Sequence, residues 1–506
     1  MSAILDGSRP LSKTNVLFAP DRFTPDRRRV LGFGLSGLTA SFSSATAAQT
    51  ATQTGRIDEL LDATAGAYET VGYSVAVLRR GTHIYSRHAG LADRDQGTRI
   101  TDRSVYPLFS ISKLFLVVEL LKARERGQID LNMPLGAIRP GLPETWRTIS
   151  LAQAIAHVSG LPDYIPDHIA PTADQAFAAI RDLPLRFAAG TRNDYNQTNF
   201  LFAKAALEQA TGTKLTTLVN HQFRQAGVHH TRYPDANRRP SGLVTSYQSV
   251  PARDRPPVPF LPESGPPYTY GSRGIRAPLS DLVAWSESLL RGELIPLGPL
   301  RASWAPFPMP SGEAAWHTHG WEYYRHNDVT IVGHGGGVRL VWRHFFRTSD
   351  PDDCATVIYL DNGGRTTFDR HRVATLIADR VMPGAARAGE EQEEILYRGL
   401  ACGRWDQAIA QLAATVPGDS LEGIVNRVGY DAMNILDVHA GLPVFQWNAA
   451  RFPQSANAHD SLGEAYRVAG ETALAKESYQ RALVLDPANA RISAILQDLN
   501  GPATER

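Results

Sequence analysis

The chain has 506 residues, 43% of them hydrophobic and 20% charged, and this composition is typical of a globular protein with a sizeable core. The 52 basic and 51 acidic residues leave a formal net charge of +1, which gives no reason to expect a nucleic acid as partner. Two cysteines, Cys354 and Cys402, are too few for a disulfide framework and lack metal-ligand spacing. We therefore expect two free thiols, although a single bridge between them stays open.

The N-terminal segment carries the parts of an export signal. Arg27, Arg28 and Arg29 precede an apolar, glycine-rich stretch over 30–42, and small residues follow up to position 48. This order is typical of a secretory signal peptide, and the adjacent arginines resemble a twin-arginine signal. The apolar stretch is shorter than the about 20 residues of a membrane span. We predict a signal peptide over 1–48 and an exported, periplasmic or secreted protein with no membrane span; a disordered basic tail is the alternative.

The next part of the chain, residues 49–382, alternates helical and strand-like patterns. Apolar periodicity predicts, in chain order, a helix over 56–68, a hairpin with strands over 74–78 and 82–88, a helix over 108–126 and strands over 329–332, 338–345 and 355–360. Such alternation indicates an α+β or α/β domain. A proline-rich stretch over 251–267 interrupts it, and this stretch is either a lid or a surface connection.

The C-terminal part is predicted to be all helical. Residues 383–394 are small and charged, which is typical of a linker, and residues 395–500 follow as a second domain. Seven positions of a tetratricopeptide repeat are matched in register, by Leu462, Gly463, Tyr466, Ala475, Tyr479, Ala482 and Pro487. Because one repeat cannot bury its own apolar face, we expect two or three units and a possible protein partner for them.

Ser110 and Lys113 are the first candidates for chemistry. They are spaced i and i+3 near the start of a helix, which places both side chains on one face. The helix is apolar all round after Lys113 and should be buried, and only six residues of the chain are lysines. Burial lowers the pKa of a lysine, so Lys113 would become a usable base. The alternative, a surface lysine, requires a polar helix face that this segment lacks.

Two further segments complete a pattern. Residues 189–200 place Tyr195 and Gln197 on a loop before a helix, and residues 331–337 place His334 and three glycines beside a strand. The order Ser-x-x-Lys, Tyr-x-Gln and His-Gly-Gly resembles the serine β-lactamase (class C) and DD-peptidase superfamily, which includes esterases and D-aminopeptidases. The resemblance covers about 56–381. It implies a β-lactamase/transpeptidase-like fold, with an antiparallel sheet, flanking helices and a helical subdomain.

The resemblance also implies roles for individual residues. Ser110 resembles the acylated nucleophile, Lys113 its base, and Tyr195 the group that relays a proton to the leaving atom. Backbone N–H groups of Ser110 and Gly337 would form the oxyanion hole, and no cofactor is implied. The substrate contacts would come from Gln197, His334, Gly336 and Gly337.

Two departures from the family pattern bear on the substrate. Gln197 stands where asparagine is usual, and His-Gly-Gly replaces Lys-Thr-Gly, so a fixed cation is missing. Arg339 is a possible substitute for that cation. We therefore predict a secreted serine hydrolase (esterase, D-aminopeptidase or β-lactamase-like) that takes a small-molecule or peptide, cell-wall-like ester or amide without an obligatory carboxylate. The alternative is a weakly active or inactive binding protein that works through its repeats.

The other histidines receive structural interpretations. His229, His230, His317 and His319 lack a carboxylate at ligand spacing, so we expect no metal site. His157 lies in a turn where support of the site is the better interpretation.

Overall fold

The computed structural model of the protein describes residues 42–164, 170–234, 241–248, 257–260, 265–337, 339–364 and 367–500. These residues form two compact units, one spanning Gln53–Glu394 and the other containing the helices from Ile395 onward. Most of the predicted signal peptide, residues 1–41, lies outside the described residues, as does much of the proline-rich stretch.

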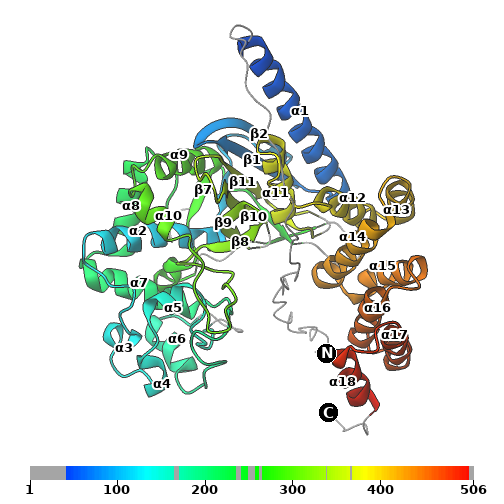
Figure 1. The fold of residues 1–506 in the computed structure, drawn as a ribbon. Coiled ribbons are helices and arrows are strands. Elements are labelled where there is room, and N and C mark those ends of the chain that lie inside the picture. Colours follow the sequence, from blue (N-terminus) through cyan, green and yellow to red (C-terminus); the bar gives the residue numbers. More distant parts are fainter. Residues whose placement is uncertain are drawn as a thin grey trace, which may run out of the picture. The chain divides into compact units, whose positions relative to one another are not determined.

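The larger unit is built on one antiparallel sheet with the strand order β3-β2-β1-β11-β10-β9-β8 (Figure 1). Its strands are β1 (Gly72–Arg79), β2 (Thr82–Asp93), β3 (Thr98–Arg99), β8 (Glu322–His326), β9 (Val329–Gly336), β10 (Leu340–Arg347) and β11 (Cys354–Asp361). Short pairs β4 (Val105–Pro107) with β7 (Arg276–Pro278) and β5 (Ser246–Gln248) with β6 (Val258–Phe260) lie outside it. The predicted α+β architecture with an antiparallel sheet is confirmed.

Alternating side chains of β10 divide the sheet into two covered faces, because successive residues of a strand point to opposite sides. On one face, Trp342 Nε1 donates to Ser286 of helix α9 (Leu279–Leu290) at 2.8 Å. On the other face, Arg343 Nε contacts His371 of helix α11 (Arg370–Val381) at 2.9 Å. The sheet is therefore buried on both sides, which explains why β1, β9, β10 and β11 are almost wholly buried.

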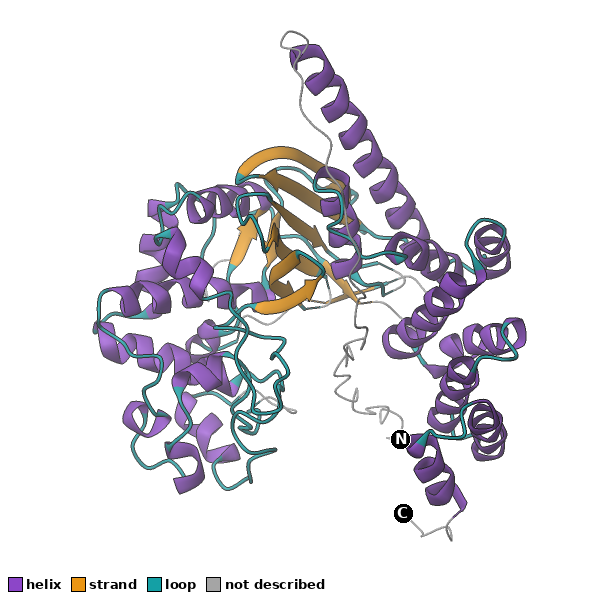
Figure 2. Cartoon of the chain, in the orientation of Figure 1, coloured by secondary structure: helices purple, strands orange, loops and turns teal. Residues whose placement is uncertain are grey.

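The helices of the larger unit, apart from α1 and α11, lie in the chain between β4 and β8 and are joined by long loops (Figure 2). They are α2 (Ser112–Glu125), α3 (Leu135–Ile138), α4 (Glu144–Arg147), α5 (Leu151–Ile155), α6 (Ala173–Ile180), α7 (Thr198–Thr211), α8 (Leu215–Gln225), α9 and α10 (Leu297–Ala302), with 3₁₀ turns η1 (Phe109–Ile111) and η2 (Pro267–Gly271). Helix α1 (Phe42–Tyr68) precedes the sheet. The predicted helix 108–126 is thus a 3₁₀ turn followed by α2, and the predicted helix 56–68 begins earlier, at Phe42.

The second unit is entirely helical in its described part. Its elements are the part of α12 (Glu390–Ala401) from Ile395 onward, α13 (Trp405–Ala413), α14 (Gly418–Asp431), the short π-helix η3 (Ala432–Leu436), α15 (Val438–Arg451), α16 (Ala456–Val468), α17 (Thr472–Leu485) and α18 (Ala490–Asn500). A Cβ on Gly463 would lie 2.9 Å from the ring of the buried Tyr479, so the small residue is what lets α16 and α17 pack together. The assignment of these helices to a particular repeat family stays a prediction.

The predicted linker 383–394 is helical at its C-terminal end. Helix α12 begins at Glu390, and Glu393 and Glu394 are buried. Arg387 donates to Glu393 at 2.6 Å, and Tyr68 Oη donates to Glu394 at 2.8 Å. These acidic residues therefore belong to the larger unit.

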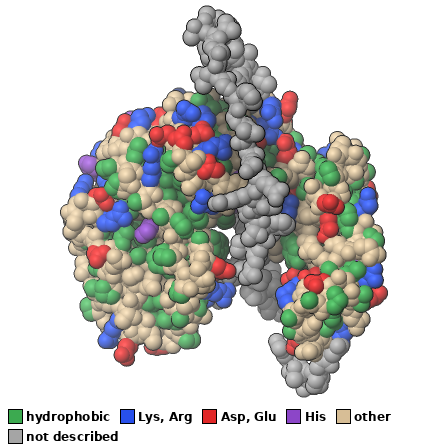
Figure 3. Space-filling view, in the orientation of Figure 1, with side chains coloured by type: hydrophobic (Ala, Val, Ile, Leu, Met, Phe, Trp, Pro, Cys, Tyr) green, Lys and Arg blue, Asp and Glu red, His purple; other side chains and the backbone are tan. Residues whose placement is uncertain are grey.

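The surface charges, the hydropathy of the helices and the two cysteines can be compared with the expectations from composition. On the face shown in Figure 3, acidic and basic side chains of the described residues are interspersed. Within the described ranges, no helix has the length and apolar character that a bilayer crossing requires. Cys354 and Cys402 are both free thiols.

Candidate active site

The segment that carries Ser110 is held in an unusual backbone conformation. Phe109, directly before Ser110, has a φ of 47°, which a residue with a side chain rarely adopts. Ser110 then lies in the 3₁₀ turn η1, and helix α2 starts two residues later. Such strain persists only where surrounding structure enforces it, and it is frequent at functional sites.

Lys113 lies in the first turn of α2, and its side chain is fully buried. Its Nζ is 3.2 Å from Ser110 Oγ and 2.7 Å from Tyr195 Oη. It also donates to Gln197 Oε1 at 2.8 Å and to the carbonyl oxygen of Ser272 at 3.1 Å. The helix start, the loop before α7 and the segment after η2 thus meet at one amine.

The contacts of Lys113 suit a neutral amine. Gln197 Oε1 and the Ser272 carbonyl accept hydrogen bonds only, so they take up the two N–H groups that a neutral amine has. The lone pair of the amine is then available to accept the proton of Ser110 Oγ, which lies 3.2 Å away. Burial, assisted by the nearby Arg273 guanidinium, holds the pKa of Lys113 well below its ordinary value. An unprotonated lysine beside a serine hydroxyl is an arrangement that can remove the hydroxyl proton.

Tyr195 completes the group. Its Oη donates to Ser110 Oγ at 2.8 Å. Burial is the main cause that raises the pKa of Tyr195, and the phenol therefore keeps its proton at neutral pH. A protonated phenol between the serine and the lysine can pass a proton onward. It does not serve as a phenolate base, because it is not ionised at neutral pH.

The His157 ring supports the loop that carries Tyr195. His157 is fully buried, and its Nδ1 accepts from the backbone N–H of Asn196 at 3.0 Å. Burial holds the pKa of His157 well below its ordinary value, so the ring is neutral. Its ring centroid lies 4.6 Å from that of Tyr195.

Strand β9 brings its glycines against the nucleophile segment. A Cβ on Gly336 would lie 2.6 Å from the carbonyl oxygen of Leu108, so only glycine permits this approach. Gly337 follows with a φ of 57°, and a Cβ there would lie 3.5 Å from the Phe109 ring. The position predicted for the second oxyanion donor is therefore adjacent to η1.

The two candidate cations are His334 of β9 and Arg339 of the turn after it, and neither directs a positive charge toward Ser110. His334 is buried, and burial lowers its pKa to about 4, so it is neutral at pH 7. Arg339 donates through Nε and Nη2 to the carbonyl oxygen of Tyr247, at 3.0 and 2.6 Å. Its guanidinium is thus engaged by the backbone.

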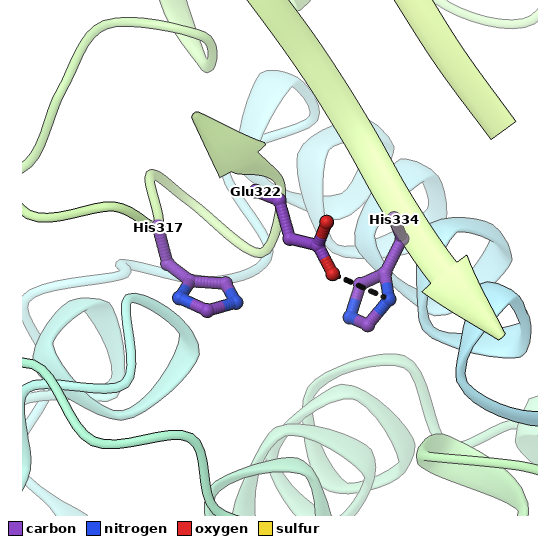
Figure 4. A group of neighbouring side chains, drawn as sticks. All are labelled: His317, Glu322 and His334. Carbon is purple, nitrogen blue, oxygen red and sulfur yellow. Dashed lines mark ion pairs between the residues drawn. The ribbon is translucent and has the colours of Figure 1, made fainter. Parts of the chain in front are cut away.

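A polar group behind Tyr195 escaped the sequence analysis. His317, Glu322 and His334 each offer a ligand atom, and these atoms lie within 4.8 Å of one another (Figure 4). Glu322 is paired with Arg343 at 2.6 Å. Burial alone would raise the pKa of Glu322, but the Arg343 cation outweighs burial and, with the neighbouring histidines, keeps this pKa well below its ordinary range. Glu322 comes five residues after His317 and lies on another element. Helical metal-ligand motifs do not have this spacing, so the sequence pattern gave no sign of the group. The pairing of Glu322 with Gly333 in the sheet is what brings it to His334.

Comparisons with known proteins agree with this geometry. The sequence profile of the family described as Beta-lactamase matches residues 57–382. A D-aminopeptidase of Brucella canis is 28% identical over 289 residues, which are 54% of this chain and 53% of that protein. A D-aminopeptidase of Cereibacter sphaeroides is 25% identical over 384 residues, 73% of this chain and 70% of that protein.

Among solved structures, the octameric penicillin-binding protein homologue from Pyrococcus abyssi aligns with a TM-score of 0.56 at 16% identity, covering 68% of this chain and 81% of that chain. This likeness shows the fold. The chain spans about half the length of the Brucella relative. Because the profile covers well over half of the residues, the chain belongs to the Beta-lactamase family.

Proposed function

We propose that this protein is a serine hydrolase that forms an acyl-enzyme on Ser110. One observation carries the proposal: Ser110 Oγ lies 3.2 Å from the buried Lys113 Nζ and 2.8 Å from Tyr195 Oη. These distances are within reach of direct proton transfer. Membership of the Beta-lactamase family supports the same reaction class.

The proposed reaction has two steps, acylation of Ser110 and hydrolysis of the acyl-enzyme. Ser110 Oγ attacks the substrate carbonyl carbon while neutral Lys113 accepts the hydroxyl proton, and the backbone N–H groups of Ser110 and Gly337 hold the oxyanion. The proton then passes through Tyr195 to the leaving alcohol or amine, and an ester with Ser110 remains. Water, deprotonated by the same group, attacks that ester, releases the acid and restores Ser110.

The substrate class we propose is an ester or an amide that needs no carboxylate. The site holds neutral His334 in the place of a fixed cation, and Arg339 is engaged by Tyr247. The D-aminopeptidase relatives favour amides and short peptides with an N-terminal D-residue within this class. A cell-wall-like peptide belongs to this class only where its recognition does not require a terminal carboxylate.

Covalent labelling tests the proposal. A fluorophosphonate probe incubated with the full chain should add one adduct by intact mass, and peptide mapping should place it on Ser110. The matched control is Ser112, whose Oγ instead accepts from the backbone N–H of Ile275 at 3.2 Å. Ser112→Ala should still be labelled, whereas Ser110→Ala should lose labelling and turn over an activated ester about 10³ to 10⁶ times more slowly. Labelling of Ser110→Ala at the wild-type rate, or mapping of the wild-type adduct to another serine, would refute the assignment.

We also propose export by the segment 1–48 and a protein partner for the C-terminal helices. The arginines at 27–29 and the small residues up to 48 support the first, and the repeat-like pattern around Gly463 supports the second. Intact mass of the protein recovered from the periplasm or medium tests export, because cleavage near residue 48 predicts a defined loss.

A further inference from the structure

The group behind Tyr195 has features that the hydrolase mechanism leaves unexplained. His317 and His334 are each 1% exposed, and the Nε2 atom of both rings is buried with no hydrogen-bond partner among the described residues. Figure 4 shows ring nitrogens of the two histidines facing a common space beside the Glu322 carboxylate. A buried polar atom without a partner has lost its hydrogen bonds to water without replacement, so two acceptor atoms at one place call for a ligand.

The hydrogen bonds around the two rings determine their tautomers. His334 Nδ1 lies 2.6 Å from the carbonyl oxygen of Gly335, which only accepts, so Nδ1 carries the proton. Asn193 uses its Nδ2 to donate to the carbonyl oxygen of Ala156 at 2.8 Å, which turns its Oδ1 toward His317 Nδ1 at 3.2 Å. His317 Nδ1 therefore donates as well. Both Nε2 atoms are left with a lone pair, the form in which imidazole binds a metal.

The neighbouring His157 provides a contrast within the same site. Its Nδ1 accepts from the backbone N–H of Asn196, so its proton is on Nε2. That atom is also buried with no partner among the described residues, but as an N–H group it offers no lone pair. The two rings beside Glu322 are thus set up as ligands, and the third ring, which lies 4.6 Å from His317, is not.

The carboxylate is oriented toward the same space. Arg343 donates to Glu322 Oε2 at 2.6 Å, while Oε1 lies 3.4 Å from His334 Nδ1 and accepts from the Gly335 N–H at 3.0 Å. Metal-binding histidines usually donate their second ring N–H to a carbonyl or carboxylate, and metal-binding carboxylates are themselves hydrogen-bonded. Each of the three side chains here has such an outer partner.

We propose that His317, Glu322 and His334 form a binding site for a divalent transition metal ion of the zinc class. Two imidazole nitrogens and one carboxylate are a ligand set that Zn²⁺ accepts, and they leave a fourth position for water. Zn–N bonds of about 2.0–2.1 Å require the ligand atoms to draw together by roughly 1 Å from their present separation. Oxygen-seeking Mg²⁺ and Ca²⁺ are disfavoured by the two nitrogens.

This proposal departs from our sequence-based expectation of no metal site, and it does not depend on the hydrolase proposal. The rings of His317 and His334 lie 5.7 and 5.9 Å from that of Tyr195, so a bound ion would add positive charge next to the proposed catalytic group. That charge would come from the position in which the strand motif lacks a lysine.

Metal content and spectroscopy test the site without using activity. The full chain, produced with zinc in the medium and passed through gel filtration, should contain about one zinc per chain. His317→Gln should lower the bound zinc at least about tenfold at the same free zinc concentration. His319→Gln, two residues away and outside the ligand group, is the matched control and should bind as the wild type does.

A second measurement uses only the wild-type chain, so it stands even if the variant folds poorly. Cobalt exchanged into the chelator-treated protein should give visible absorption bands of a four- or five-coordinate site with nitrogen and oxygen ligands. Retained zinc that His317→Gln does not reduce, or a wild-type chain with neither zinc nor the cobalt bands, would overturn the proposal.

Discussion

Two lysines of helix α2 are buried, and their surroundings differ in charge. Lys122 is paired with Glu119 at 2.8 Å, so its positive charge has a partner. Lys113 contacts the neutral oxygens of Gln197 and Ser272 and has an arginine, Arg273, as a nearby charge. The two buried lysines of α2 therefore have different roles: Lys122 forms an ion pair, and Lys113 is the proposed base. Their contacts, and not their burial, distinguish these roles.

The lowered pKa of Lys113 predicts the pH dependence of turnover. Ester hydrolysis should rise as Lys113 loses its proton and reach its plateau well below about pH 10.4, where a free lysine titrates. The measurement is kcat/KM for an activated ester between pH 5 and 11, as an order-of-magnitude window around these values. A rate that still climbs at the upper end would contradict a desolvated base.

The same shift predicts a pH-dependent stability. The pKa of Lys113 is lowered in the folded state and is about 10.4 in the unfolded state. At a pH between these two values, Lys113 is protonated mainly in the unfolded chain. The contribution of Lys113 to the free energy of unfolding therefore increases as pH rises through this interval. Lys113→Met removes the titration. The melting temperature of the wild type minus that of Lys113→Met should therefore increase as pH rises from neutrality toward 10.4. A difference that stays constant over this range would mean that the folded-state pKa of Lys113 is not lowered.

His334 predicts a substrate preference. In the chelator-treated, metal-free protein, its pKa of about 4 leaves the strand motif uncharged at pH 7, so esters should be better substrates than penicillins or peptides that end in D-Ala-D-Ala. His334→Lys should shift the ratio of kcat/KM values toward the carboxylate-bearing substrates, because a fixed cation is added. The comparison uses one ester and one penicillin with each enzyme. A wild-type preference for the penicillin of about tenfold, or roughly 1.4 kcal/mol, would contradict this interpretation.

At the scale of elements, strand β9 and the turn η1 position the site together. Gly336 lies against the carbonyl oxygen of Leu108, and the strained Phe109 follows that residue. The contact with β9 thus restricts the position of the segment that carries Ser110. A change in the separation of these two backbones would move Ser110 and Gly337 relative to each other.

Gly336→Ala should test this contact. Its Cβ would lie 2.6 Å from the Leu108 oxygen and 3.2 Å from Ile111, so either the strand or the turn must shift. We expect a loss of about 1–3 kcal/mol of stability and a drop in kcat that reaches about 10²-fold for a shift of roughly 1 Å. Gly298→Ala is the control, because nothing lies within 4 Å of its Cβ. Wild-type kcat in Gly336→Ala would show that the contact is not needed.

The same elements show how far a sequence can predict this fold. The strands of β9, β10 and β11 and the serine–lysine spacing follow from local periodicity, because side chains i and i+3 of one helix necessarily lie together. The contact between Glu322 and His334 does not follow. It depends on β8 pairing with β9 so that Glu322 opposes Gly333, and many sequences with the same pattern would allow another register. Helix α2 was placed too early because the 3₁₀ turn shares its apolar pattern.

At the scale of the molecule, the boundary between the two units lies within helix α12. Glu393 and Glu394 belong to the larger unit, where they are buried and contact Arg387 and Tyr68. The composition of 383–394 suggests a solvated linker, since glutamates are almost never fully buried unless paired. Arg387 lies six residues before Glu393, whereas Tyr68 lies 326 residues before Glu394, and composition reports neither pairing.

This boundary predicts how the chain can be shortened. Deletion from Gly403 onward keeps all of α12, whereas deletion from Ala388 onward also removes Glu393 and Glu394 and leaves Arg387 and Tyr68 without these partners. Units of helical repeats contact mainly their neighbours, so the first deletion should leave ester turnover and the melting transition of the larger unit little changed. The second should lower its melting temperature, because Arg387 loses its ion pair with Glu393 and the buried Tyr68 hydroxyl loses its acceptor. Solubility, melting temperature and turnover of both truncated chains, measured beside the full chain, distinguish these results. Equal behaviour of the two truncations would mean that the acidic residues contribute nothing to the larger unit, and loss of folding in both would show that the C-terminal helices are needed for it.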